Sequence, residues 1–250
     1  MARTFAALLV GFLAAGYAQV AHGQQGLHAP DGGTRETLTS IVVPPLPNAP
    51  FSATVQTEWT KYLADGSTQF TQNHRLIARD VLGRVFQERR TFGPKGSPIE
   101  SQVWRIELAE PSTQTVAYCD TRAHVCELRL YVAPPSTTPP AGPLANARGL
   151  VSENLGSRML NGVDLIGTRE TQTLSPLVTG SDHPLTVVKE FWFSRHLGLN
   201  VLTTRNDPRS GKEVFTVTDI RQGEPDAALF TLPSDARIVD LRGVPASSIR

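Results

Sequence analysis

The last third of the sequence, from Leu185 to Pro233, consists almost entirely of predicted β-strands and short turns. Alternating or continuous apolar runs predict strands at 185–194, 199–205 and 213–220. The turns between these strands contain glycine or proline, which interrupt regular structure. A meander of long strands requires a large curved sheet. No catalytic motif interrupts this segment.

The preceding segments also favour strands. Phe51, Ala53, Val55, Thr57 and Trp59 alternate with polar residues, as in a half-buried strand. Further strands are predicted at 68–80, 84–92, 101–109, 113–119, 124–132 and within 150–175, where Asn161-Gly162 marks a hairpin turn. The best helix candidate is the short segment from Pro225 to Phe230. About ten strands and few short helices indicate a mainly β fold, a β-dominated α+β class with a single curved antiparallel sheet.

The N-terminal segment predicts export. A single positive charge precedes an apolar run at 5–18 and small residues at 21–23, which is the order found in a secretory signal peptide. The run is shorter than a membrane-spanning helix requires. We therefore expect a cleaved signal peptide over residues 1–23, with cleavage after Gly23, or alternatively after Ala18. The mature chain is expected to be secreted or periplasmic, with no transmembrane span.

The remaining organisation follows from composition. Residues 24–50 are polar and then proline-rich, which predicts a flexible or loosely docked lead-in. The β domain is expected over 51–233, and the proline-rich stretch 133–149 is interpreted as a long surface loop rather than a linker between two domains. Residues 234–250 are expected to form a C-terminal tail.

The two cysteines of the chain, Cys119 and Cys126, are expected to form a disulfide. Both lie in predicted strands that flank a short turn, where facing residues are close enough to bridge. An oxidising compartment favours the disulfide. The alternative is a metal site that adds Asp120 and His124, but its spacing fits none of the usual zinc patterns.

Charge and motifs give no indication of an enzyme. Loss of residues 1–23 takes the formal net charge from +1 to about 0, and this balance argues against nucleic acid or an anionic membrane as the main partner. Nucleophile elbows, zinc-protease motifs and phosphate-binding loops are missing from the sequence. Asp182, His183 and His196 flank one predicted strand and offer an alternative surface metal or acid/base site. We predict no catalytic residue, no cofactor and no metal.

Aromatic residues supply the candidate ligand site. Several lie in predicted strands among aliphatic neighbours, and they form either an ordinary core or the lining of an apolar cavity on the concave side of the sheet. The candidates are Trp59, Phe70, Phe86, Trp104, Phe191 and Phe193. Trp192 lies on the other side of its strand from Phe191 and Phe193. It is either exposed as a contact surface or covered by the lead-in.

Three motifs of the last third carry a family resemblance. They are Trp192-Phe193-Ser194, the turn from Asp207 to Gly211 and the segment from Glu224 to Pro233, in a chain that also holds Gly162 and Gly167-Thr168-Arg169. The chain resembles the outer-membrane lipoprotein-carrier superfamily, the LolA-like half-barrels, and uncharacterised secreted bacterial proteins of this kind. The resemblance implies a half-barrel-like sheet whose concave face takes an acyl chain. Helices that plug this face in the carriers have no counterpart here, and no catalytic residues are implied.

These observations favour a non-enzymatic exported protein that binds a lipid or lipoprotein acyl chain on the concave face. An envelope sensor or protein-interaction module without bound lipid is the alternative. A hydrolase with an unrecognised site is a third.

Overall fold

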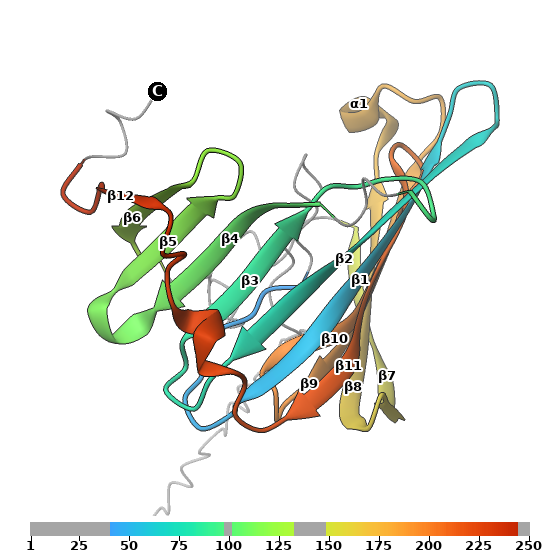
Figure 1. The fold of residues 1–250 in the computed structure, drawn as a ribbon. Coiled ribbons are helices and arrows are strands. Elements are labelled where there is room, and N and C mark those ends of the chain that lie inside the picture. Colours follow the sequence, from blue (N-terminus) through green and yellow to red (C-terminus); the bar gives the residue numbers. More distant parts are fainter. Residues whose placement is uncertain (1–40, 98–101, 133–148, 245–250) are drawn as a thin grey trace, which may run out of the picture.

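The computed structural model describes residues 41–97, 102–132 and 149–244. They form a single sheet of twelve strands that does not close into a barrel (Figure 1). The strands are β1 (Phe51–Tyr62), β2 (Thr68–Arg79), β3 (Val85–Arg90), β4 (Val103–Glu110), β5 (Thr115–Asp120), β6 (Val125–Leu130), β7 (Leu150–Leu160), β8 (Val163–Leu174), β9 (Leu185–Ser194), β10 (Leu199–Asp207), β11 (Gly211–Gln222) and β12 (Arg237–Asp240). The predicted mainly β fold with a single curved sheet is confirmed. The expected signal peptide and nearly all of the expected proline-rich loop lie outside the described residues.

The order of the strands across the sheet is β12-β6-β5-β4-β3-β2-β1-β11-β10-β9-β8-β7. Two runs of consecutive antiparallel strands therefore meet where β1 pairs with β11. The edge strand β12 is the exception, because it pairs with β6 in parallel. Short helices interrupt the described chain at η2 (Pro111–Thr113), α1 (Pro176–Thr179) and η4 (Ala227–Phe230), the last of which falls within the predicted helix. None of the helices in the described segments has the length and apolar character needed to cross a membrane.

The two faces of the sheet are covered by different ends of the chain. Residues 41–49 pack on one face, where Ile41 and Val43 join the apolar cluster of Val55, Phe215 and Val217. We call this the inner face. The segment 227–236 packs on the opposite, outer face (Figure 1). Residues that pair across neighbouring strands share a face, so the register assigns each side chain to one of the two.

The sheet curves toward its inner face. Arg79 of β2 donates from Nη2 to the carbonyl oxygen of Leu197, in the turn between β9 and β10, over 2.8 Å. In the sheet, β1 and β11 separate β2 from β10. In a flat sheet with strands about 4.8 Å apart, β2 and β10 would lie about 14 Å from each other. An arginine side chain does not span that distance, so the strands must bend around the inner face.

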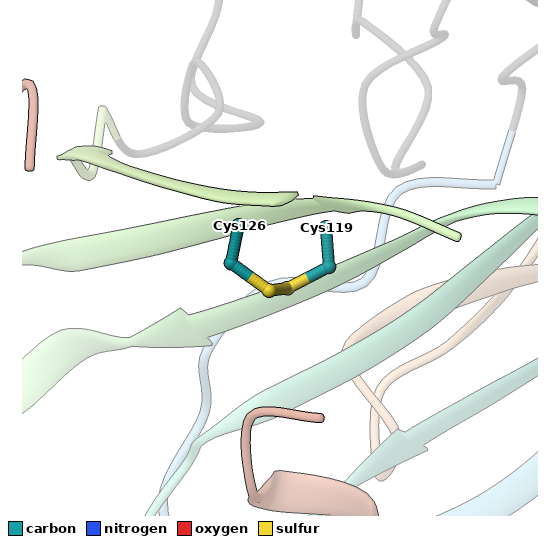
Figure 2. Close-up of a disulfide and its surroundings, with 2 residues drawn as sticks. All are labelled: Cys119 and Cys126. Atoms are coloured by element: carbon teal, nitrogen blue, oxygen red, sulfur yellow. A yellow bond between two sulfur atoms is a disulfide. The ribbon is translucent and has the colours of Figure 1, made fainter. Parts of the chain in front are cut away.

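The outer face holds the disulfide. Cys119 of β5 and Cys126 of β6 are directly paired, and their sulfur atoms are bonded (Figure 2). Both are buried in a cluster with Ala78, Phe86 and Leu108, against which Leu229 and Phe230 pack. The predicted disulfide is confirmed, and the alternative metal site is not formed.

Two segments differ from what the sequence predicts. Of the lead-in, residues 41–49 are described, and they are not loosely docked: Ile41 is fully buried and Asn48 donates its N–H to the carbonyl oxygen of Val81. Within the expected C-terminal tail, β12 adds a strand to the sheet. Neither segment has an alternating pattern, since Ile41 to Val43 is a short apolar run before prolines and β12 has four residues.

Candidate functional site

The six aromatic candidates are divided between the two faces. Trp59 and Phe191 lie on the inner face, where Trp59 donates from Nε1 to the carbonyl oxygen of Ser210 over 3.1 Å and Phe191 is fully buried. Phe193 is buried near the end of β9, opposite Asn200. These three side chains belong to the packed interior of the half formed by β1 and β8 to β11.

The other three candidates lie elsewhere. Phe86 is buried on the outer face beneath η4, in the cluster that holds the disulfide. Phe70 pairs with Thr60 on the outer face and is 38% exposed. Trp104 lies at an irregularity of β4, with the guanidinium of Arg105 4.6 Å from its ring centroid. The structure thus does not bring the six residues together, and none of them lines the cavity of about 700 Å³ on the inner face of β3 to β6.

Trp192 is covered, and it belongs to the buried cluster that also holds Ile41 and Val43 of the lead-in. Its side chain is 9% exposed. The Arg158 guanidinium of β7 lies 3.7 Å from its ring centroid, and Gly167 of β8 lies directly against the ring. The expectation of an exposed contact surface at Trp192 is therefore wrong, and Arg158 and Gly167 of the β7–β8 hairpin provide part of its cover.

The candidate site is a cavity of about 700 Å³ between residues 41–43 and the inner face of β3 to β6. This volume lies within the range of small-molecule sites. Ile41, Val42 and Val43 form one wall. Its lining otherwise combines apolar, aromatic and charged side chains: Val85, Gln87, Arg89, Arg105, Glu107, Ala109, Val116, Tyr118, Glu127, Arg129, Leu130, Tyr131 and Val132.

The wall of the cavity is fixed by a buried arginine. Arg75 of β2 donates from Nη2 to the carbonyl oxygen of Ile41 over 2.9 Å and from Nη1 to Oε1 of Gln87 over 2.9 Å. Burial, followed by the nearby charge of Arg89, lowers the pKa of Arg75 to about 9. Arg75 is still protonated at neutral pH, so it adds positive charge next to the cavity.

Ion pairs line the floor of the cavity. Arg89 of β3 binds Glu107 of β4 through two hydrogen bonds of 2.9 and 2.6 Å. Arg129 binds Glu127 on β6 over 2.7 Å. Burial, followed by the charge of Glu107, raises the pKa of Tyr118, whose ring lies 5.5 Å from the Arg105 guanidinium. The site therefore has apolar walls and a charged floor, which suits an amphipathic molecule better than a wholly apolar one.

The histidine alternative gains no support from the geometry. His183 and Asp182 are hydrogen-bonded to each other and exposed, whereas His196 lines a second hollow with Arg158, Met159 and Arg195. Across residues 41–97, 102–132 and 149–244, no group of three or more histidine, cysteine or acidic side chains is arranged to hold a metal.

The sequence reasoning missed the residues that line the cavity. A signal for them was present on two strands, since Arg105 and Glu107 of β4 flank Ile106, and Glu127 and Arg129 of β6 flank Leu128. On β3, Gln87 and Arg89 flank the charged Glu88, so the pattern there gives no face. Both faces of the sheet carry a buried apolar cluster. The polar side chains of β3, β4 and β6 lie on the inner face, where they line the cavity.

Comparison with known proteins gives structural neighbours only. No family model matches the sequence, and no curated protein matches it. A Pseudomonas aeruginosa MucA/MucB complex is similar to this chain at a TM-score of 0.42 and 13% identity, over 76% of this chain and 58% of that one. A LolA superfamily protein from Nitrosomonas europaea is similar at 0.29 and 11%, over 74% and 91% of the two chains. Lipoprotein LppX from Mycobacterium tuberculosis is similar at 0.26 and 11%, over 70% and 87%.

One of these neighbours is described as a LolA superfamily protein. The match covers 57–60% of the length of the MucB chains. At such low identities and TM-scores, we carry no residue role and no activity over from these proteins.

Proposed function

We propose that this protein is a non-catalytic secreted or periplasmic binding protein, and that its ligand is a lipid or a lipoprotein acyl chain held in the inner-face cavity. The observation that carries the proposal is the cavity of about 700 Å³ between the ordered segment 41–43 and the sheet. Val85, Val116 and Val132 line it beside this segment and offer apolar contact to a chain. The disulfide supports an oxidising compartment.

The geometry also supports a route by which a ligand enters. Residues 41–43, which form the wall, have no regular secondary structure. They are held to the sheet by Arg75 and by burial of Ile41 and Val43. Movement of such a segment opens the cavity without breaking any pairing between strands. Ligand binding is then coupled to the lead-in and leaves the twelve-stranded sheet intact.

The first test is purification from the native compartment, solvent extraction and mass spectrometry of the extract. We expect a lipid or acylated peptide in stoichiometric amount. Ala109→Trp places a large side chain in the cavity, and we expect it to abolish lipid retention. Thr204→Trp, on the outer face of β10, is the matched control and should retain lipid. A folded wild-type protein that retains no lipid and binds none would contradict the proposal.

The alternative function is recognition of an envelope protein, and the edge strand β7 favours it. Among the described strands β7 pairs with β8 alone, and Val151 and Met159 are 63% and 69% exposed. The edge strand of a sheet is a template for a strand from a partner.

A photo-crosslinker at Val151 tests this alternative in cells. We expect one defined adduct if β7 docks a partner, and none with the same crosslinker at Leu82, which is 68% exposed near β3. Val151→Lys should reduce partner binding without changing lipid retention. An identical adduct pattern at both positions would argue against β7 as a docking strand.

A further inference from the structure

Arg105 is the one arginine lining the cavity that pairs with no carboxylate among the described residues. Its guanidinium lies 4.6 Å from the centroid of the Trp104 ring and 5.5 Å from that of the Tyr118 ring. Aromatic stacking occupies the faces of a guanidinium and leaves the N–H groups at its edge free to bind an acceptor. The arrangement holds a rigid cation at the cavity surface.

The acidic residue paired directly with Arg105 is Asp120, and its carboxylate binds backbone N–H groups of a turn. Asp120 of β5 pairs with Arg105 across the sheet. However, Oδ1 of Asp120 accepts hydrogen bonds from the backbone N–H groups of Arg122 and Ala123, over 2.8 and 2.7 Å. Asp120 thus stabilises the β5–β6 turn. Among the described residues no ion pair within 4 Å joins it to Arg105, although the charge of Arg105 helps to lower the pKa of Asp120.

The charged side chains that line the cavity carry a net positive charge. Arg89 is its direct cross-strand partner on β3, and like charges in that position repel each other. The glutamates of the cavity, Glu107 and Glu127, are hydrogen-bonded to Arg89 and Arg129. Three arginines against two glutamates leave one positive charge in the lining, contributed by Arg105.

From this geometry we infer that the cavity binds an amphiphile with an anionic headgroup, and that Arg105 is the residue that binds its carboxylate or phosphate. The inference rests on the proposed lipid-binding function and specifies its ligand class. The acyl chain contacts Val43, Val85 and Val116, and the headgroup lies against the free edge of the Arg105 guanidinium. A bound anion also offsets the repulsion between Arg89 and Arg105.

The test compares lipids with the same acyl chain and different headgroups. Equilibrium binding of radiolabelled oleate, 1-oleoyl-lysophosphatidate and monoolein is measured on the purified full-length mature protein. We expect the two anionic lipids to bind about tenfold or more tighter than neutral monoolein, as charge-assisted hydrogen bonds exceed neutral ones. The ratio of oleate to lysophosphatidate binding distinguishes a carboxylate from a phosphate ligand.

Arg105→Gln removes the charge from the cavity. We expect this variant to lose the preference for anionic lipids and to keep the affinity for monoolein, whereas Arg105→Lys should retain part of the preference. Arg122→Gln removes the same charge from the exposed β5–β6 turn and is the matched control. Circular dichroism and thermal unfolding establish that each variant is folded.

The outcomes separate the inference from the function on which it rests. Equal binding of all three lipids by the wild type would overturn the anionic ligand class and leave lipid binding intact. Binding of none of them would overturn the proposed function itself. An equal loss of affinity for all three lipids in Arg105→Gln would show that Arg105 only packs in the wall, which overturns its assignment as the headgroup residue.

Discussion

Trp192 of β9 and Gly167 of β8 are paired across the sheet, and the Trp192 ring occupies the space that a side chain at position 167 would need. A Cβ atom at Gly167 would lie 2.7 Å from a ring carbon of Trp192 and 2.9 Å from the Cβ atom of Leu155. The ring has little room to move away, because Arg158 stacks on it and its side chain is 9% exposed. Gly167 is therefore required by close packing.

We predict that Gly167→Ala destabilises the protein by about 1–3 kcal/mol, the usual cost of overpacking. Urea unfolding measures the free-energy change. In a Trp192→Leu background the same substitution should cost less, and the double-mutant cycle gives the coupling between the two positions. Gly243→Ala, in open space, should change stability by less than about 0.5 kcal/mol. Additive effects at positions 167 and 192 would contradict this packing explanation.

Residues of the motifs that carry the family resemblance have structural roles. Oδ1 of Asp207 accepts from the N–H of Arg209, and a Cβ atom at Gly211 would lie 2.0 Å from the carbonyl oxygen of Thr60. Oγ of Ser194 accepts from the N–H of Leu197. Oε2 of Glu224 accepts from the N–H of Val81. These contacts explain why the motifs predict the fold while leaving the ligand unspecified.

At the scale of elements, the β5–β6 hairpin is stabilised by both the disulfide and its packing. Cys119 and Cys126 are seven residues apart, and their Cα atoms are 3.9 Å apart. The pair lies in the outer cluster beneath Leu229 and Phe230, and β12 pairs with β6 next to it. The disulfide therefore supports the edge of the sheet that the C-terminal segment completes.

We predict that the double variant Cys119→Ala/Cys126→Ala is destabilised by about 2.5 kcal/mol, as the chain-entropy model gives for so short a loop. Urea unfolding with and without reductant measures the effect. The wild type with reductant should approach the stability of the variant, and the variant should not respond to reductant. A wild type whose stability is unchanged by complete reduction would contradict this expectation.

The sequence predicts strands well and their faces poorly. Alternation in β1 and the Asn161-Gly162 turn correctly indicated a strand and a hairpin. In β2, however, Ile77 packs on the inner face and Ala78 on the outer, because both faces are covered and apolar residues occupy both. The pattern therefore did not show that Phe86 and Phe191 lie on opposite faces. It also gave no indication of β12, whose pairing partner lies more than 100 residues away in the chain.

At the scale of the whole molecule, a buried cation joins segments that are far apart in the sequence. Arg79 donates to the carbonyl oxygens of Pro44, Ala49 and Leu197 over 2.8 to 3.0 Å, and its guanidinium lies 5.0 Å from the centroid of the Phe51 ring. Burial lowers the pKa of Arg79 to about 10, which leaves it charged at neutral pH. Arg79 thus joins the lead-in, β2 and the β9–β10 turn on the inner face of the sheet.

We predict that Arg79→Met destabilises the protein by about 3–5 kcal/mol, because it leaves three carbonyl oxygens without their donor and each such loss costs about 1–3 kcal/mol, partly offset by removal of a buried charge. Arg79→Lys keeps the charge but lacks the planar set of donors that reaches all three oxygens, so it should also be destabilised.

Urea unfolding measures the stability of these variants, and hydrogen exchange at the amide of Asn48, which bonds to Val81, reports whether the lead-in still docks. Arg221→Met, an exposed position on β11, is the control and should change stability by less than about 0.5 kcal/mol. Full stability together with an unchanged Asn48 exchange rate in Arg79→Met would show that strand twist alone curves the sheet, and that the lead-in docks through Ile41 and Val43 without the clamp.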